Sequence, residues 1–131
     1  MKSDIWGPDA WLFLHTITLN YPDKPNEKDK DNYKIFFDSL QNILPCEKCK
    51  IHYSENIKKY PIDLESKESL VKWLFNLHNE VNKLNNKGIF NYNDFINKYS
   101  NLYNENNKNN KQLLIILGLI ILLLIVLYLR K

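Results

Sequence analysis

Residues 69–84 read SLVKWLFNLHNEVNKL, and this stretch decides the fold class. Its apolar side chains recur every three or four residues, which is the spacing of one face of an α-helix. Asp63 or Ser66 is suited to cap the start of this helix, and Asn85, Asn86 and Gly88 are expected to end it. A regular amphipathic helix of this kind predicts a helical domain. The residues of the apolar face are Leu70, Leu74, Leu77, Val81 and Leu84.

Further helices are expected on both sides of this one. The first should begin after Gly7, because Pro8 suits the first helical position, and should stop before Pro22. The polar residues 22–31 are expected to be a loop. Together the segments predict a compact helical bundle of about 100 residues. The other expected helices cover residues 33–44, a segment opened by Pro45, and a segment that begins at Asn93.

The composition limits the fold and the partners. The chain has 131 residues, enough for one small domain and an appendage. Only three are glycines, which argues against a sandwich or barrel with many tight turns. The formal net charge is +3, but without Arg130 and Lys131 the basic residues exceed the acidic ones by only one. We therefore expect no nucleic acid as a partner.

The C-terminal segment has a different character. Residues 113–129, LLIILGLIILLLIVLYL, contain no charged side chain. As a helix they would be about 25 Å long, close to the thickness of bilayer hydrocarbon, so we expect a transmembrane helix. The start of the chain, MKSDIWGPDAW, does not resemble a signal peptide because it carries charges and a proline. This predicts a domain at residues 1–103, a polar linker at 104–112 and a single-pass C-terminal anchor.

The only two cysteines lie in LPCEKCKIHY, residues 44–53. They could be inert buried thiols, because free cysteine is often buried. They could bind zinc, since the pair with His52 and His78 offers two sulfurs and two nitrogens. They could also form a redox disulfide, because the free N–H groups and the dipole at a helix start stabilise a thiolate. The spacing favours the redox alternative and leaves the other two open.

Two further blocks accompany the cysteine pair. WGPDAWLFLHTITLNYP, residues 6–22, precedes it, and HNEVNKLNNKGIF, residues 78–90, follows it. In this order and at this spacing the three blocks resemble the FAD-linked sulfhydryl oxidases of the Erv/ALR family. The resemblance extends from residue 6 to about residue 95. It implies an all-α domain, a four-helix bundle plus a short fifth helix, that holds FAD beside the disulfide.

The resemblance also implies an activity. An enzyme of this family oxidises protein dithiols, passes the electrons through the cysteine pair to FAD and then to O2, and releases H2O2. Cys46 is the expected interchange thiol, Cys49 the thiol next to the flavin, and no metal is implied. The alternative function is a non-enzymatic, membrane-tethered zinc-binding or helical adaptor domain.

The same resemblance suggests partners and a location. Because the chain has no further cysteines, substrates would reach Cys46 directly, and a homodimer would be held without disulfides. A thioredoxin-like relay protein is a further expected partner. The low cysteine content and the anchor are similar to those of oxidases of large cytoplasmic DNA viruses. This suggests a catalytic domain on the cytosolic face of a host or virion membrane.

The expected FAD-binding residues come from several helices. Trp11 and His15 share a face of the first expected helix and can pack against the cofactor. His78 and Asn82 are one turn apart on the fourth and can offer a ring nitrogen and an amide. Lys87, just beyond that helix, can meet the diphosphate. The full set is Gly7, Trp11, His15, Cys49, His52, His78, Asn79, Asn82 and Lys87.

Overall fold

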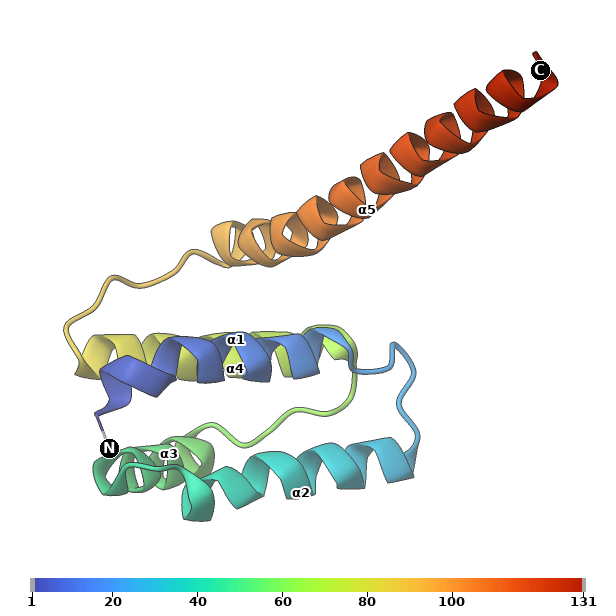
Figure 1. Ribbon diagram of the computed structural model, residues 1–131. Coiled ribbons are helices and arrows are strands. Elements are labelled where there is room, and N and C mark those ends of the chain that lie inside the picture. The colour runs from blue at the N-terminus through green and yellow to red at the C-terminus, as the bar shows by residue number, and fades with distance from the viewer. Residues whose placement is uncertain (1, 131) are drawn as a thin grey trace. The chain divides into compact units, whose positions relative to one another are not determined.

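The computed structural model describes residues 2–130, without the side chains at 103–112, 123, 124 and 126. No strand occurs in this part of the chain, so the predicted all-α class is confirmed. The chain forms two compact units, Met1–Ile89 and Phe90–Lys131. The predicted domain of residues 1–103 extends into both units, and its boundary stays a prediction. The helices are α1 (Ser3–Leu19), α2 (Glu27–Ile43), α3 (Glu47–Lys59), α4 (Lys67–Leu84) and α5 (Tyr92–Leu129) (Figure 1).

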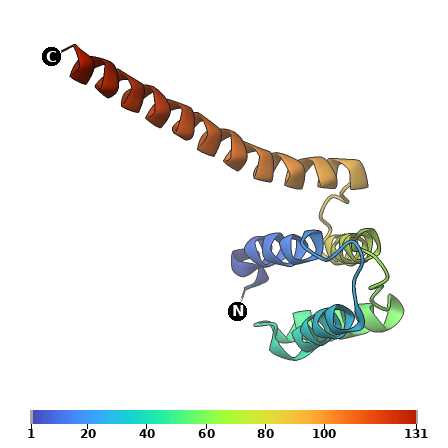
Figure 2. The same cartoon turned by 90° about the vertical axis from the view of Figure 1, so that its right-hand side faces the viewer.

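The first unit is a two-layer bundle of the helices α1 to α4. Helix α1 packs on α4, α2 packs on α3, and α3 also contacts α4. Figures 1 and 2 show α1 and α4 side by side in one layer and α2 and α3 side by side in the other. The loop from α1 to α2 and the loop from α3 to α4 both cross between the layers. Residues far apart in the sequence are thereby brought together between the layers.

Helix α4 supplies the centre of this unit. Leu70, Leu74 and Leu77 are all 0% exposed, as the apolar pattern predicted. From the other layer, the ring of Phe37 meets Trp73 edge-on, with 5.1 Å between the ring centroids. Burying a leucine side chain completely stabilises a fold by about 1.5–3 kcal/mol. The apolar face of α4 therefore contributes a large share of the free energy that holds the layers together.

The burial predicted from the apolar pattern is wrong for the last residue of α4. Leu84 is 55% exposed, although it belongs to the same face by spacing. Residues 85–88, which follow it directly, are all exposed and carry no apolar side chain that could cover it. The chain turns at Asn86, whose φ of 52° lies in the left-handed region that asparagine tolerates. The helix therefore ends at Asn85 and Asn86 as predicted, and Gly88, which was named with them, does not adopt a positive φ.

Two helices begin earlier than predicted. Helix α1 begins at Ser3 and contains Pro8, which removes only one backbone hydrogen bond near the helix start. Helix α2 begins at Glu27, inside the expected loop of residues 22–31. Its start is fixed by a capping box, in which Asn26 and Asp29 each accept a hydrogen bond from the backbone N–H of the other, at 2.9 and 3.0 Å. Both residues of this box lie in the sequence segment that was expected to be a loop.

Helix α5 includes the residues of the predicted linker. It begins at Tyr92, one residue before the expected Asn93, and its backbone stays helical through residues 104–112. No glycine or proline lies between Tyr92 and Leu117, so nothing in the backbone chemistry ends the helix there. The predicted transmembrane segment includes residues 123, 124 and 126, whose side chains lie outside the described part. Within the described part, no helix is both long enough and apolar enough to cross a membrane.

We predict that Tyr21→Phe destabilises the first unit by about 1–3 kcal/mol, because it leaves a buried carbonyl without its donor. Tyr21 is 0% exposed, and its hydroxyl donates to the backbone oxygen of Leu64 at 2.9 Å, joining the two loops that cross between the layers. Burial raises the pKa of this phenol, so it stays a donor at neutral pH. Urea unfolding followed by tryptophan fluorescence measures the loss.

The control for this prediction is Tyr128→Phe. Tyr128 is 79% exposed on α5, so the same chemical change there should leave the urea midpoint unaltered. All three tryptophans lie in the first unit, so the signal reports the unit in question. Equal midpoints for the wild type and Tyr21→Phe would contradict the prediction.

Candidate active site at the start of α3

The two cysteines form a disulfide at the start of α3, with 5.1 Å between their Cα atoms. Cys46 is the N-cap residue, in the extended conformation with φ −145° and ψ 118°. Its sulfur accepts a hydrogen bond from the backbone N–H of Cys49 at 3.2 Å. Both side chains are half-buried. Of the three alternatives left open by the sequence, the structure has the disulfide.

The other two alternatives do not describe the pair. Neither sulfur is a free thiol, because the chain has only these two cysteines and they are bonded to each other. Among the described residues, no group of three or more histidines, cysteines or acidic residues is arranged to hold a metal ion. His78 lies against α1 instead of the cysteines, as shown below.

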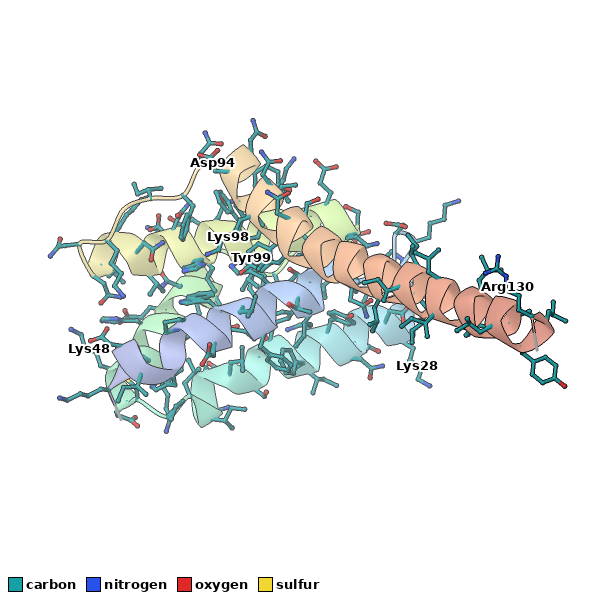
Figure 3. All side chains as sticks on the ribbon, turned by 45° about the horizontal axis from the view of Figure 1, so that its top comes forward. Lys28, Lys48, Asp94, Lys98, Tyr99 and Arg130 are labelled. Atoms are coloured by element: carbon teal, nitrogen blue, oxygen red, sulfur yellow. A yellow bond between two sulfur atoms is a disulfide. The ribbon has the colours of Figure 1, made fainter. Side chains whose placement is uncertain are left out.

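The first turn of α3 also carries charged side chains. Lys50 pairs with Glu47, with 3.2 Å between its ammonium nitrogen and the carboxylate. Lys48 is exposed and is labelled in Figure 3 at the outer side of the unit. Its charge adds to the positive end of the helix dipole. When the disulfide is reduced, both effects favour a thiolate at the capping position.

Helix α3 is held against α2 close to the disulfide. The buried Tyr53 donates its hydroxyl hydrogen to the backbone oxygen of Phe37 at 3.0 Å. Burial raises the pKa of the Tyr53 phenol, which keeps it protonated as a donor. One residue on, Ser54 donates to the side-chain oxygen of Gln41 at 3.1 Å. These contacts fix the orientation of α3 and therefore the position of the cysteines.

An indole and two imidazoles meet between α1 and α4. The rings of Trp11 and His78 are stacked, with 3.9 Å between centroids and 6° between planes. The Nε2 atom of His15 and the Nδ1 atom of His78 are 3.0 Å apart and share a hydrogen bond. One of these nitrogens must carry the proton and the other accept it. His15 is 0% exposed. The structure thus brings three of the predicted cofactor residues together.

Two buried amides follow on α4. Asn79 and Asn82 are 8% and 6% exposed. Among the described residues, no acceptor lies within hydrogen-bond distance of the Nδ2 atom of Asn82. A buried donor without a partner costs about 1–3 kcal/mol, so such groups are rare unless a ligand completes them. The position predicted to bind a cofactor therefore carries an unused donor.

The remaining predicted residues are less enclosed. His52 is half-buried on α3, three residues after Cys49. Lys87 is exposed beyond α4, and its ammonium nitrogen is 3.9 Å from the carboxylate of Asp4 near the start of α1. Gly7 lies inside α1, where a Cβ atom would meet no atom within 4 Å. The packing of this chain therefore does not require glycine at position 7.

One buried polar residue was missed by the sequence analysis. Asn56 on α3 is 9% exposed, and its Nδ2 atom has no acceptor among the residues that the structure describes. The available signal was its spacing, because it follows His52 by four residues and Cys49 by seven. A polar residue seven positions after Cys49 lies on the same face of the helix as that cysteine.

Comparison with known proteins gives the family of this chain. A family model described as the Erv1 / Alr family matches residues 8–100 of the 131. The chain belongs to the Erv1 / Alr family. The match includes the Erv1 / Alr cysteine pair, the indole and imidazole cluster and the amides of α4.

Several named proteins are similar to this Erv1 / Alr chain. A probable FAD-linked sulfhydryl oxidase of Acanthamoeba polyphaga mimivirus is 42% identical over 95 residues, covering 70% of this chain and 66% of the relative. An FAD-linked sulfhydryl oxidase of African swine fever virus is 34% identical over 94 residues, covering 72% and 79%. The ERV1 oxidase of Arabidopsis thaliana is 35% identical over 89 residues, covering 68% of this chain and 46% of the relative. The chain thus spans just under two thirds of the mimivirus protein and about half of the plant one.

Solved structures of the family have the same fold. The crystal structure of the FAD binding domain of Erv1 from Saccharomyces cerevisiae superimposes with a TM-score of 0.69 at 31% identity. The superposition includes 71% of this chain and 89% of the yeast domain. The yeast Erv1 core gives a TM-score of 0.68 at 30% identity, with 71% of this chain and 79% of that one covered. The four-helix arrangement of the first unit is therefore that of the Erv1 / Alr fold.

We predict that, after reduction, Cys46 is alkylated by iodoacetamide roughly tenfold faster than Cys49 at pH 7, because a helix start that stabilises a thiolate raises the reactive fraction. The comparison uses two single-thiol variants, Cys49→Ser for Cys46 and Cys46→Ser for Cys49. The backbone N–H of residue 49 that bonds the Cys46 sulfur is retained in Cys49→Ser. Mass spectrometry over time gives both rates. Equal rates, or a faster Cys49, would contradict the expected order.

Proposed function

We propose that this chain is an FAD-dependent sulfhydryl oxidase, which forms disulfides in substrate proteins and reduces O2 to H2O2. The observation that carries the proposal is the disulfide at the N-terminus of α3, half-buried in a chain of the Erv1 / Alr family. Proteins named as FAD-linked sulfhydryl oxidases are 34–42% identical to it in two viruses. The reaction is 2 R–SH + O2 giving R–S–S–R + H2O2.

The residues between α1, α3 and α4 fit FAD as the cofactor. Asn82 offers a buried donor that lacks a protein acceptor in the described part of the chain, and the cofactor is rich in acceptors. Trp11 and His78 offer stacked ring faces for an aromatic group. When bound, FAD supplies a two-electron acceptor that passes the electrons on to O2. The proposed cofactor-binding residues are Gly7, Trp11, His15, Cys49, His52, His78, Asn79, Asn82 and Lys87.

The chemistry of the cysteine pair follows from thiol–disulfide exchange. A substrate thiolate attacks the sulfur of Cys46; the new bond joins substrate to Cys46, and the bond to Cys49 breaks. Cys49 leaves as a thiolate. The second thiolate of the substrate then attacks the substrate sulfur of the mixed disulfide and releases Cys46 as a thiolate. The substrate is now oxidised by two electrons, and the cysteine pair holds them.

The protein assists these steps through the start of α3. The N–H of Cys49 already points at the sulfur of Cys46, so a hydrogen bond is in place for the thiolate formed in the second step. The exposed Lys48 adds positive charge near it. We assign Cys46 as the interchange thiol and Cys49 as the thiol that faces the flavin. The contacts of Tyr53 and Ser54 with α2 keep this geometry rigid.

Protein dithiols are the proposed substrates, and a thioredoxin-like relay protein is a proposed partner. The chain has no third cysteine to shuttle electrons, so the substrate must dock directly against Cys46. We also propose a homodimer held without disulfides. The rival function, a non-enzymatic zinc-binding or helical adaptor domain, is not favoured. A zinc site would require free thiolates where the structure has a disulfide, and the similar viral proteins are named as oxidases.

We predict that Cys49→Ser abolishes oxygen consumption with dithiothreitol while the purified protein keeps its yellow flavin. The substitution removes the leaving group of the first exchange and leaves the imidazole and amide residues in place. An oxygen electrode and the visible spectrum provide the two measurements. Glu55→Ser, at an exposed position of the same helix, is the matched control and should stay active. A colourless wild-type protein, or full turnover by Cys49→Ser, would refute the proposed function.

We propose in addition that residues 113–129 anchor the chain in a membrane, with the oxidase domain on the cytosolic face of a host or virion membrane. The support is the absence of charge over these residues in the sequence. Charged residues at the centre of a membrane helix cost about 2.5–3.5 kcal/mol each.

We therefore predict that the full chain resists alkaline carbonate extraction from membranes of expressing cells, and that the double variant Leu117→Asp, Ile121→Asp is released. Two aspartates at exposed positions of α2, Ile35→Asp and Ile43→Asp, provide the control with equal added charge. Immunoblots of pellet and supernatant report the distribution. Release of the wild-type chain would show that these residues do not anchor it.

A further inference from the structure

Asn56 is a buried polar residue on α3 that no step above uses. It is 9% exposed, and the structure places no acceptor near its Nδ2 atom among the residues described. Buried polar atoms without partners are few in native proteins, and each has a specific explanation. In the first unit, the Nδ2 atom of Asn82 on α4 is in the same state. Two buried amide donors are therefore unused. One lies on α3, which begins at the redox pair, and the other lies on α4, which carries His78.

The position of Asn56 on α3 separates it from the contact with α2. At about 100° per residue, Asn56 lies within about 20° of Cys49 and about 40° of His52 around the helix axis. Tyr53 and Ser54, whose side chains bond to α2, centre on a direction about 110° away from Asn56. The amide of Asn56 therefore shares a face of α3 with Cys49 and points away from the mean direction of the two contacts with α2.

The distance along the helix also fits a ligand shared with Cys49. Seven residues of α-helix rise about 10 Å, so Asn56 lies two turns deeper than Cys49 on the same face. The sulfur of Cys49 must meet the redox-active edge of the flavin for the proposed reaction. A ligand that touches Cys49 and extends along this face of α3 passes Asn56 with its ring or its ribityl chain. Both of these parts carry hydrogen-bond acceptors.

We propose that Asn56 is a further FAD-binding residue, whose side-chain amide donates a hydrogen bond to an acceptor of the flavin half of the cofactor. This rests on the proposed function, since it needs FAD in the unit formed by α1 to α4. The juxtaposition that supports it is a buried, unpartnered amide donor on the face of α3 that also carries Cys49 and His52. Because the donor has no protein partner, its use is in the complex and not in the fold.

The test is Asn56→Leu in the full chain, a change that keeps the number and branching of the side-chain heavy atoms and removes the donor. Without FAD, the variant should unfold at the same temperature as the wild type or higher, because an unsatisfied buried amide has been replaced by an apolar group. With FAD, its affinity should be about tenfold weaker, the loss of one buried hydrogen bond. The visible absorption bands of bound flavin should shift. ADP, which lacks the flavin half, should bind both proteins equally.

The control is Asn76→Leu, the same substitution at an exposed position of α4, which should change none of these values. Lower stability of Asn56→Leu without FAD, together with unchanged FAD affinity, would overturn the inference by assigning the amide to the fold. Equal losses of affinity for FAD and ADP would overturn the assignment to the flavin half. Failure of the wild type to bind FAD is a separate result, and it would refute the proposed function itself.

Discussion

The structure of the first unit depends on the burial of one face of α4. Leu70, Leu74 and Leu77 are fully enclosed, so any arrangement of the other helices must cover them. Helix α1 covers α4 from the same layer and α3 from the other. This one constraint brings His15 of the first helix to His78 of the fourth, 63 residues later in the chain. The hydrophobic effect therefore brings the members of the polar site together, and the hydrogen bond and ring stacking between them form where the two helices meet.

Sequence reasoning worked where a physical rule acts locally. The period of apolar residues predicted α4, and proline and serine residues with known end preferences bounded α3 and α4. It failed where two local rules competed. The polar composition of residues 22–31 predicted a loop, although Asn26 begins a capping box there. Pro8 was expected at the first helical position, although it lies inside α1. Leu84 was misassigned because a helical period does not say where the neighbouring helices end.

The candidate site was predictable in part for the same reason. Trp11, His15, His78 and Asn82 share faces of two helices, and spacing along a helix is readable from sequence. The pairing of α1 with α4 cannot be read from the sequence, so the 3.0 Å contact between the imidazoles became visible only in the structure. Asn56 went unnoticed because asparagines are abundant in this chain, and its spacing from Cys49 and His52 acquires meaning only once its burial without a partner is known. The unpaired amide donors of Asn56 and Asn82 lower the stability of the ligand-free fold. Such a loss of stability is common at sites that serve function.

The capping role of Cys46 has a thermodynamic consequence for the disulfide. The same sulfur atom caps the start of α3 and changes its charge with its oxidation state. A thiolate accepts the hydrogen bond from the N–H of Cys49 more strongly than a disulfide sulfur does, and the positive end of the helix dipole favours it further. The fold therefore stabilises the reduced pair relative to the oxidised one. Stabilising the reduced form raises the reduction potential, which makes the Cys46–Cys49 disulfide a stronger oxidant of other thiols.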